Sequence, residues 1–209
     1  EYRALFKHSL WMVPGVKEAR ALKKLMLKHP VFGNGMFDIV NVAGSGDEEE
    51  KAEEALSKVR KAIKSAGDNY TITLSCGKLT TGVTVKEWTA VFMLAGSFST
   101  SAANYLQTIF RVQSPCNENG KIKNTAYVFD FAPDRTLKMV SQAVSVSSKA
   151  GKTKIGDKQI MGKFLNYCPV IAVSGSQMQE YSATKLLQQL KKAYAEKVVR
   201  NGFDDTSLY

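Results

Sequence analysis

The sequence predicts an α/β fold, with an open parallel sheet that carries helices on both faces. Two observations predict it: short apolar runs alternate with helical patterns, and several of these runs are apolar throughout. Such runs are typical of parallel strands, because helices cover both faces of a parallel sheet. We expect this domain over residues 1–145 and a mixed basic extension, ending in a long amphipathic helix, over residues 146–209.

Five short runs rich in apolar or β-branched residues are the expected strands. The first ends at Pro14 and Gly15, and Phe92, Phe129 and Phe131 of the last two are expected in the core. A sixth short run lies in the extension. The expected strands are residues 8–13, 37–42, 70–75, 90–94, 126–131 and 170–174.

Apolar residues at helical spacing mark the connecting helices. In the second helix acidic residues stand at the start and basic residues at the end, which suits the helix dipole, and Gly67 follows as a stop. The extension begins with a loop rich in Ser, Lys and Gly. The expected helices are residues 16–29, 47–66 and 101–113, one beginning at Asp134, and residues 182–200.

Charge favours an anionic partner. The chain of 209 residues has a formal net charge of +10, and its acidic residues concentrate between positions 47 and 54. Nucleic acid is the first candidate partner, and a solvated basic surface is the equal alternative. No apolar run approaches the roughly 20 residues that span a bilayer, so no membrane partner is expected.

Cysteine and histidine usage predicts no metal site. The three cysteines are far apart, which argues against a disulfide framework and against zinc ligation and favours a reducing, cytoplasmic compartment. His8 and His29 have no Cys or His at ligand spacing and are expected to be structural or exposed. Because the chain starts at Glu1, we expect it to be a piece of a longer protein.

A loop with phosphate-binding chemistry follows the third expected strand. The stretch from Thr73 to Val85, TLSCGKLTTGVTV, contains Thr80, Thr81 and Gly82. Backbone N–H groups and threonine hydroxyls are donors that suit phosphate oxygens. An ordinary strand-to-loop turn is the alternative.

A second candidate site lies on the third expected helix. Gln107 and Arg111 are four residues apart, so their side chains share a face. An arginine at a cleft can neutralise charge on a transferring phosphate, and a surface arginine paired along the helix is the alternative. Because ligands bind at the carboxyl ends of parallel strands, we expect the Arg111 guanidinium at that edge and outside the interior.

These motifs, in this order, resemble the second RecA-like domain of superfamily 2 helicases and translocases, in particular the helicase-like ATPases of bacterial restriction enzymes. The resemblance covers residues 1–145. It rests on the strand and helix from Leu10 to Leu22, on the loop from Ile72 to Val85, and on the helix YLQTIFRVQSP from Tyr105 to Pro115.

The resemblance implies a RecA-like fold and a set of site residues. Gln107 and Arg111 would face ATP. The nucleic-acid backbone would be touched by Thr80, Thr81 and Gly82, with Pro14 and Gly15 nearby. Phe110 and Ser114 replace a glycine and a second arginine of the usual motif, and Thr84 replaces a frequent aspartate, so only one arginine finger is carried over.

The resemblance also implies cofactors and partners. ATP and Mg²⁺ would be held mainly by a first, N-terminal RecA-like domain of the same parent chain, and double- or single-stranded DNA would be the partner. The segment Gly151-Lys152-Thr153 is no P-loop, because Val146 stands where the motif requires glycine. We therefore expect the parent protein to hydrolyse ATP, and we expect this chain alone not to hydrolyse it.

Two other functions stay open. The same fold could bind nucleic acid through a basic face without any catalysis. A methyltransferase is the weaker alternative, because Ala43-Gly44-Ser45-Gly46-Asp47 lies between a strand and a helix. Glu49 replaces the third glycine of a full dinucleotide-binding fingerprint.

Overall fold

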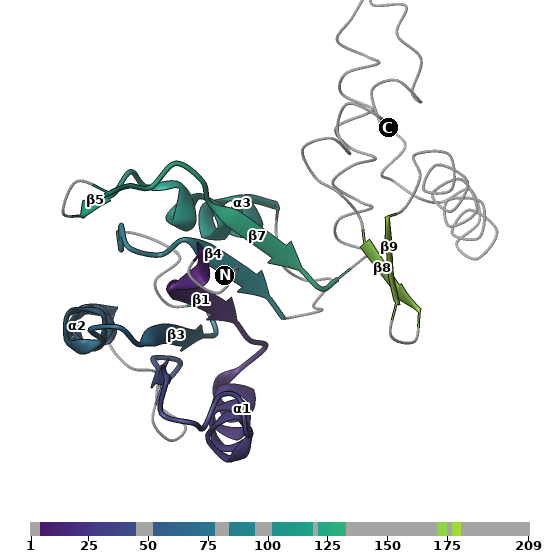
Figure 1. Ribbon diagram of the computed structural model, residues 1–209, viewed down its shortest axis with the longest axis horizontal. Helices are drawn as coiled ribbons and strands as arrows, with labels where there is room; N and C mark the ends of the chain where they lie inside the picture. The colour runs from purple at the N-terminus through teal and green to yellow at the C-terminus, as the bar shows by residue number, and fades with distance from the viewer. Residues whose placement is uncertain are drawn as a thin grey trace, which may run out of the picture. The chain divides into compact units, whose positions relative to one another are not determined.

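The computed structural model describes residues 5–44, 52–77, 84–94, 102–118, 121–132, 171–174 and 177–180. The chain divides into two compact units, Glu1–Pro133 and Asp134–Tyr209. The first unit holds a parallel sheet with its helices, and the described part of the second is a short hairpin (Figure 1). The expected domain boundary at residue 145 stays a prediction.

The five predicted strands of the first unit form one sheet, in the order β2-β3-β1-β4-β7. All four pairings between neighbours are parallel. The predicted α/β class with an open parallel sheet is therefore confirmed. The strands are β1 (His8–Met12), β2 (Phe37–Asn41), β3 (Tyr70–Ser75), β4 (Ala90–Met93) and β7 (Tyr127–Asp130).

The described helices match the predicted ones. They are α1 (Val16–Lys28), α2 (Ala52–Ser65) and α3 (Ala102–Phe110), and α3 continues into the 3-10 helix η2 (Arg111–Gln113). Gly67 has a φ of 56°, a left-handed conformation that suits the end of a helix. Residues 47–51 of the second predicted helix, and the helices predicted from Asp134 and over residues 182–200, lie outside the described residues.

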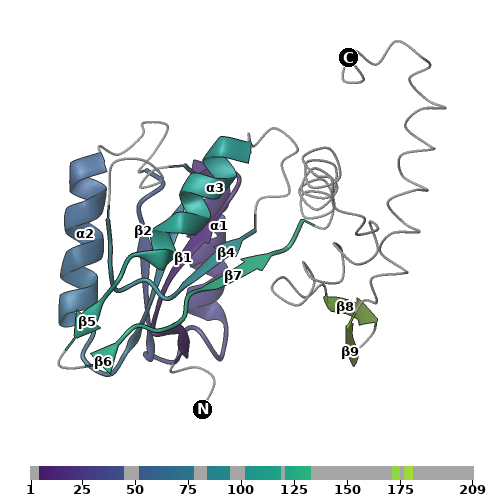
Figure 2. The same cartoon turned by 90° about the horizontal axis from the view of Figure 1, so that it is seen from above.

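The helices cover both faces of the sheet. α1 packs on one face, where Ala19 and Met26 join Ile39, Ile72 and Leu74 in a buried cluster. α2 and α3 lie on the opposite face (Figures 1 and 2). Right-handed crossovers require this division, because the chain moves along the sheet in one direction through α1 and in the other through α2 and α3.

A row of aromatic side chains crosses the face of the sheet on which α1 packs. Phe92 and Phe129 are stacked with their ring centroids 4.6 Å apart, and Trp11 lies 5.0 Å from Phe92. Phe131, which was expected in the core, is instead 59% exposed. That expectation was wrong because Phe131 directly follows β7, the edge strand of the sheet.

Two short hairpins were not predicted. The first pairs β5 (Asn117–Glu118) with β6 (Lys121–Ile122), and the second pairs β8 (Ile171–Ser174) with β9 (Gln177–Glu180). β8 confirms the strand predicted at residues 170–174. β5 and β9 are rich in Asn, Gln and Glu, which carry little strand propensity, so sequence patterning gives no signal for them.

His8 is buried at the start of the central strand β1. Its Nδ1 atom lies 2.9 Å from the Thr71 hydroxyl of the neighbouring strand β3. Burial, aided by the positive charge of Lys7, lowers the pKa of His8 from 6.5 to about 4. His8 therefore has a structural role in the neutral form, as its sequence context predicted.

We expect Leu10→Ala to lower the free energy of unfolding by about 3 kcal/mol, because truncating a buried leucine leaves a cavity. Leu10 is fully buried in β1, whereas Leu25 of α1 is 65% exposed. The matched control Leu25→Ala should cost less than about 0.5 kcal/mol. Urea titrations of the two variants and the unsubstituted chain measure both values, and equal losses would contradict the assigned core.

Stability should also fall in acid because of His8. Its folded pKa lies below the unfolded one, so the unfolded state binds more protons, and stability is lost as the pH falls from 6.5 towards 4. The loss can reach about 3 kcal/mol. Urea midpoints between pH 7 and pH 4 test this prediction. The fall should be clearly shallower in His8→Gln, and an unchanged slope in that variant would contradict it.

Candidate functional site

Pro14 and Gly15 lie at the carboxyl edge of the sheet, as expected. They follow β1 after one residue, Val13. Gly15, in an extended conformation, is the N-cap of α1, and its carbonyl oxygen accepts a hydrogen bond from the Ala19 amide at 3.0 Å. The Glu18 carboxylate lies over Gly15, so close that a β-carbon there would clash with it. A phosphate at this helix start would therefore meet a negative charge.

Thr80, Thr81 and Gly82 lie outside the described residues, so their contribution to a phosphate-binding loop stays a prediction. The residues on either side of this loop, Gly77 and Thr84, are described. Gly77, with a φ of 118°, is the second residue after β3, and Thr84 is exposed. The Cys76 thiol lies 3.7 Å from the Ala43 carbonyl oxygen, so the loops after β2 and β3 start side by side at the carboxyl edge.

The predicted helix face carrying Gln107 and Arg111 is confirmed as an outer face of α3 and η2. Gln107 is exposed and Arg111 is half-buried. Between them in the sequence, Phe110 is 54% exposed. The opposite face is turned inward, with the buried side chains of Tyr105, Thr108 and Val112.

The expected position of Arg111 at the carboxyl edge was wrong. α3 starts after the carboxyl end of β4 and runs back along the sheet, so Arg111 lies at the end of α3 that points away from that edge (Figure 2). The reason is the crossover from β4 to β7, which must return the chain to the amino end of the next parallel strand. The structure therefore does not bring Arg111 together with Pro14 and Gly15.

Lys123 anchors the segment that follows η2. Its ammonium donates hydrogen bonds to the carbonyl oxygens of Lys86 at 2.7 Å and Trp88 at 3.0 Å, and its amide donates to the Cys116 carbonyl at 2.9 Å. Desolvation by burial lowers the pKa of Lys123. Sequence reasoning missed this residue because a lone lysine near a strand carries no signal of its carbonyl partners.

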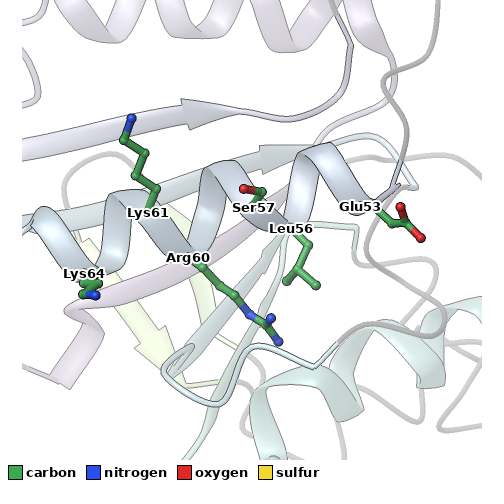
Figure 3. A pocket seen from close by; sticks show the side chains of 6 residues that line it. All are labelled: Glu53, Leu56, Ser57, Arg60, Lys61 and Lys64. Carbon is green, nitrogen blue, oxygen red and sulfur yellow. The ribbon is translucent and has the colours of Figure 1, made fainter.

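A shallow hollow of about 450 Å³ lies along α2 (Figure 3). Arg60 and Leu56 point to one side of the helix and Lys61 to the other. None of the predicted site residues lines it. Its described lining residues are Glu53, Leu56, Ser57, Arg60, Lys61 and Lys64.

The described part of the chain contains no group of three or more His, Cys, Asp or Glu side chains that could hold a metal ion. None of the helices in that part is long and apolar enough to cross a membrane.

Comparison with known proteins shows that the chain is similar to part of a bacterial protein. It is 35% identical over 179 residues to a protein of Mycoplasma pneumoniae named "Putative type II restriction enzyme and methyltransferase RM.MpnORF110P C-terminus". The match covers 83% of this chain and 24% of that protein, so the chain spans about a quarter of the length of its relative. No family model matches the chain.

The Lys123 anchor predicts a measurable loss on substitution. Lys123→Met removes two hydrogen bonds from a charged donor, and because the ammonium is partly solvated we expect a cost of about 1 kcal/mol in the free energy of unfolding. Lys86→Met is the matched control, because only the backbone carbonyl of exposed Lys86 takes part. Urea titration checks both variants, and a loss in the control as large as in Lys123→Met would refute the anchor.

Proposed function

We propose that the chain is the C-terminal, second RecA-like motor domain of an ATP-dependent DNA helicase or translocase that belongs to a restriction–modification system. The observation that carries the proposal is the outer face of α3, where exposed Gln107 and half-buried Arg111 stand on a parallel α/β unit. The similarity to a restriction enzyme supports the part of the proposal that assigns the chain to a restriction–modification system. The order of the motifs supports the motor assignment.

Arg111 would act as an arginine finger, a cation that stabilises charge on a transferring phosphate. The sequence contains no P-loop, so the nucleotide would be held by another lobe of the parent protein. Ligands of open α/β sheets bind at the carboxyl edge, and Arg111 lies at the end of α3 that points away from that edge. The proposal therefore requires that the other lobe present its nucleotide to the outer face of α3.

ATP and Mg²⁺ are the proposed cofactors, with both held mainly by the first RecA-like domain. DNA is the proposed partner of the loop with Thr80, Thr81 and Gly82. A formal net charge of +10 supports an anionic partner of this kind. Glu18 beside Gly15 makes Pro14 and Gly15 weaker candidates for a phosphate contact than that loop.

A methyltransferase is the second candidate, because the name of the relative includes that activity. Val42, Ala43 and Gly44 follow β2 and are buried, and Gly44 has a φ of 135°. Binding of S-adenosylmethionine in calorimetry would favour this candidate. A non-catalytic nucleic-acid-binding module is the third, and it predicts DNA binding by a parent protein that hydrolyses no ATP.

We expect Arg111→Ala, in the full-length parent protein, to lower DNA-stimulated ATP hydrolysis at least about a thousandfold, the usual contribution of an arginine finger. DNA binding should change less than about twofold, because the finger contacts the nucleotide and removes one of many cationic charges. A coupled ATPase assay and DNA titration at fixed salt measure the two quantities.

The control for this experiment is Arg60→Ala, which removes an exposed arginine of a different helix, α2. It should leave ATP turnover within about twofold of the unsubstituted protein, as expected for a surface substitution. Turnover retained in Arg111→Ala would reject the arginine-finger assignment, and loss of turnover in both variants would show that the effect is not specific to Arg111.

A further inference from the structure

We propose that the amino edge of the sheet binds the phosphate backbone of duplex DNA through four side chains, the amino-edge lysines. They are Lys7, Lys28, Lys64 and Lys86. Arg60, which lies more than one turn before the end of α2, is not among them. The inference rests on the proposed function for its partner, DNA, but it requires neither ATP hydrolysis nor an arginine finger. It adds an interaction surface at the edge opposite to the proposed phosphate-binding loop.

The topology of the sheet brings the amino-edge lysines to the same edge. Lys7 directly precedes β1, and Lys28 and Lys64 lie in the last turns of α1 and α2, which return the chain to the amino ends of β2 and β3. Lys86 lies shortly before β4, and its carbonyl oxygen accepts the hydrogen bond from Lys123. Figure 2 shows the C-terminal ends of α2 and α3 at one edge, beside the β5–β6 hairpin. One lysine therefore lies on the segment that leads to each of four neighbouring strands.

The spacing of the amino-edge lysines suits a DNA backbone. The sheet order β2-β3-β1-β4 places Lys28, Lys64, Lys7 and Lys86 across the edge in this sequence. Neighbouring strands lie about 4.8 Å apart, so three spacings amount to about 14 Å. A DNA strand rises about 3.4 Å per phosphate, so this distance matches about four phosphate spacings. Because α1 and α2 lie on opposite faces of the sheet, the surface is also broad, which suits a duplex better than a single strand.

The carboxyl edge has the opposite balance of charge. Glu18 lies over Gly15, Glu53 and Glu54 lie in the first turn of α2, and Asp130 ends β7. The basic side chains described near this edge are Lys17 and Arg20, in the first half of α1. In the described part of the chain, acidic side chains therefore outnumber basic ones at this edge, and a phosphate backbone would be repelled there.

The excess of cations at the amino edge is larger than helix stability requires. The helix dipole favours cations in the last turn of a helix, which accounts for Lys28 and Lys64 but not for Lys7 and Lys86, which lie outside the helices. Lys28, Lys64 and Lys86 are exposed. Arg111 and Lys123 add positive charge near this edge, and the acidic side chains described there are Asp38, Asp68 and Glu87. An exposed cationic surface of this kind attracts a polyanion.

Lysine footprinting of the full-length parent protein tests the surface directly. The protein is acetylated with and without duplex DNA of random sequence, and mass spectrometry measures the rate at each lysine. We expect DNA to lower the rates at Lys64 and Lys86 severalfold, because a bound phosphate backbone excludes the reagent. Exposed Lys17, at the carboxyl edge, is the internal reference and should keep its rate. Unchanged rates at Lys64 and Lys86, or equal protection of Lys17, would overturn the proposal.

Substitution gives a second test through the salt dependence of DNA binding. The combination of Lys64→Gln and Lys86→Gln should make the slope of log K against log salt concentration shallower by about 1.8, because each phosphate contact contributes about 0.9. The matched control, Lys17→Gln with Arg20→Gln, removes the same charge from exposed positions of α1 near the carboxyl edge and should leave the slope unchanged. Urea titration verifies that both variants fold. The same slope in both folded variants would contradict the proposal.

The two proposals fail in different ways. If the parent protein hydrolyses no ATP but DNA protects Lys64 and Lys86, the motor assignment fails and the amino-edge surface stands. If DNA stimulates ATP hydrolysis and Arg111→Ala abolishes it, while Lys64 and Lys86 stay fully reactive, the motor assignment stands and the amino-edge surface fails.

Discussion

The parallel pairing of β1 with both β3 and β4 is the constraint on which the rest of the first unit depends. Because β1 lies in the middle of the sheet, both of its faces must be covered, and Leu10 is fully buried. Right-handed crossovers then assign α1 to one face and α2 and α3 to the other. The outer face of α3, with Gln107, Phe110 and Arg111, follows from this arrangement and from the buried side chains beneath the helix.

The strands and helices of the sheet could be predicted because each has a local pattern. Apolar runs predict β1 and β4, and charge placement together with Gly67 predicts α2. The hairpin of β5 and β6 could not be predicted, since its position depends on Lys123 and on carbonyl groups from a distant segment. The exposure of Phe131 likewise follows from strand order, which local patterns do not contain.

The candidate site was predicted in part. Helical spacing correctly placed Gln107 and Arg111 on one face outside the interior. The rule that ligands bind at the carboxyl edge of a parallel sheet wrongly predicted that Arg111 lies at that edge. The direction of α3 is fixed by the crossover from β4 to β7, and a rule about strands cannot give the position of the far end of a helix. The position of the Glu18 carboxylate beside Gly15 could not be predicted either, because it depends on the side-chain conformation of Glu18.

The motor assignment is most directly tested by ATP hydrolysis in the full-length parent protein, measured with and without duplex DNA of random sequence. We expect turnover to rise severalfold when DNA is added and to decline with increasing salt, because phosphate contacts are screened. A protein that is folded and binds DNA, but hydrolyses no ATP in either condition, would contradict the central claim.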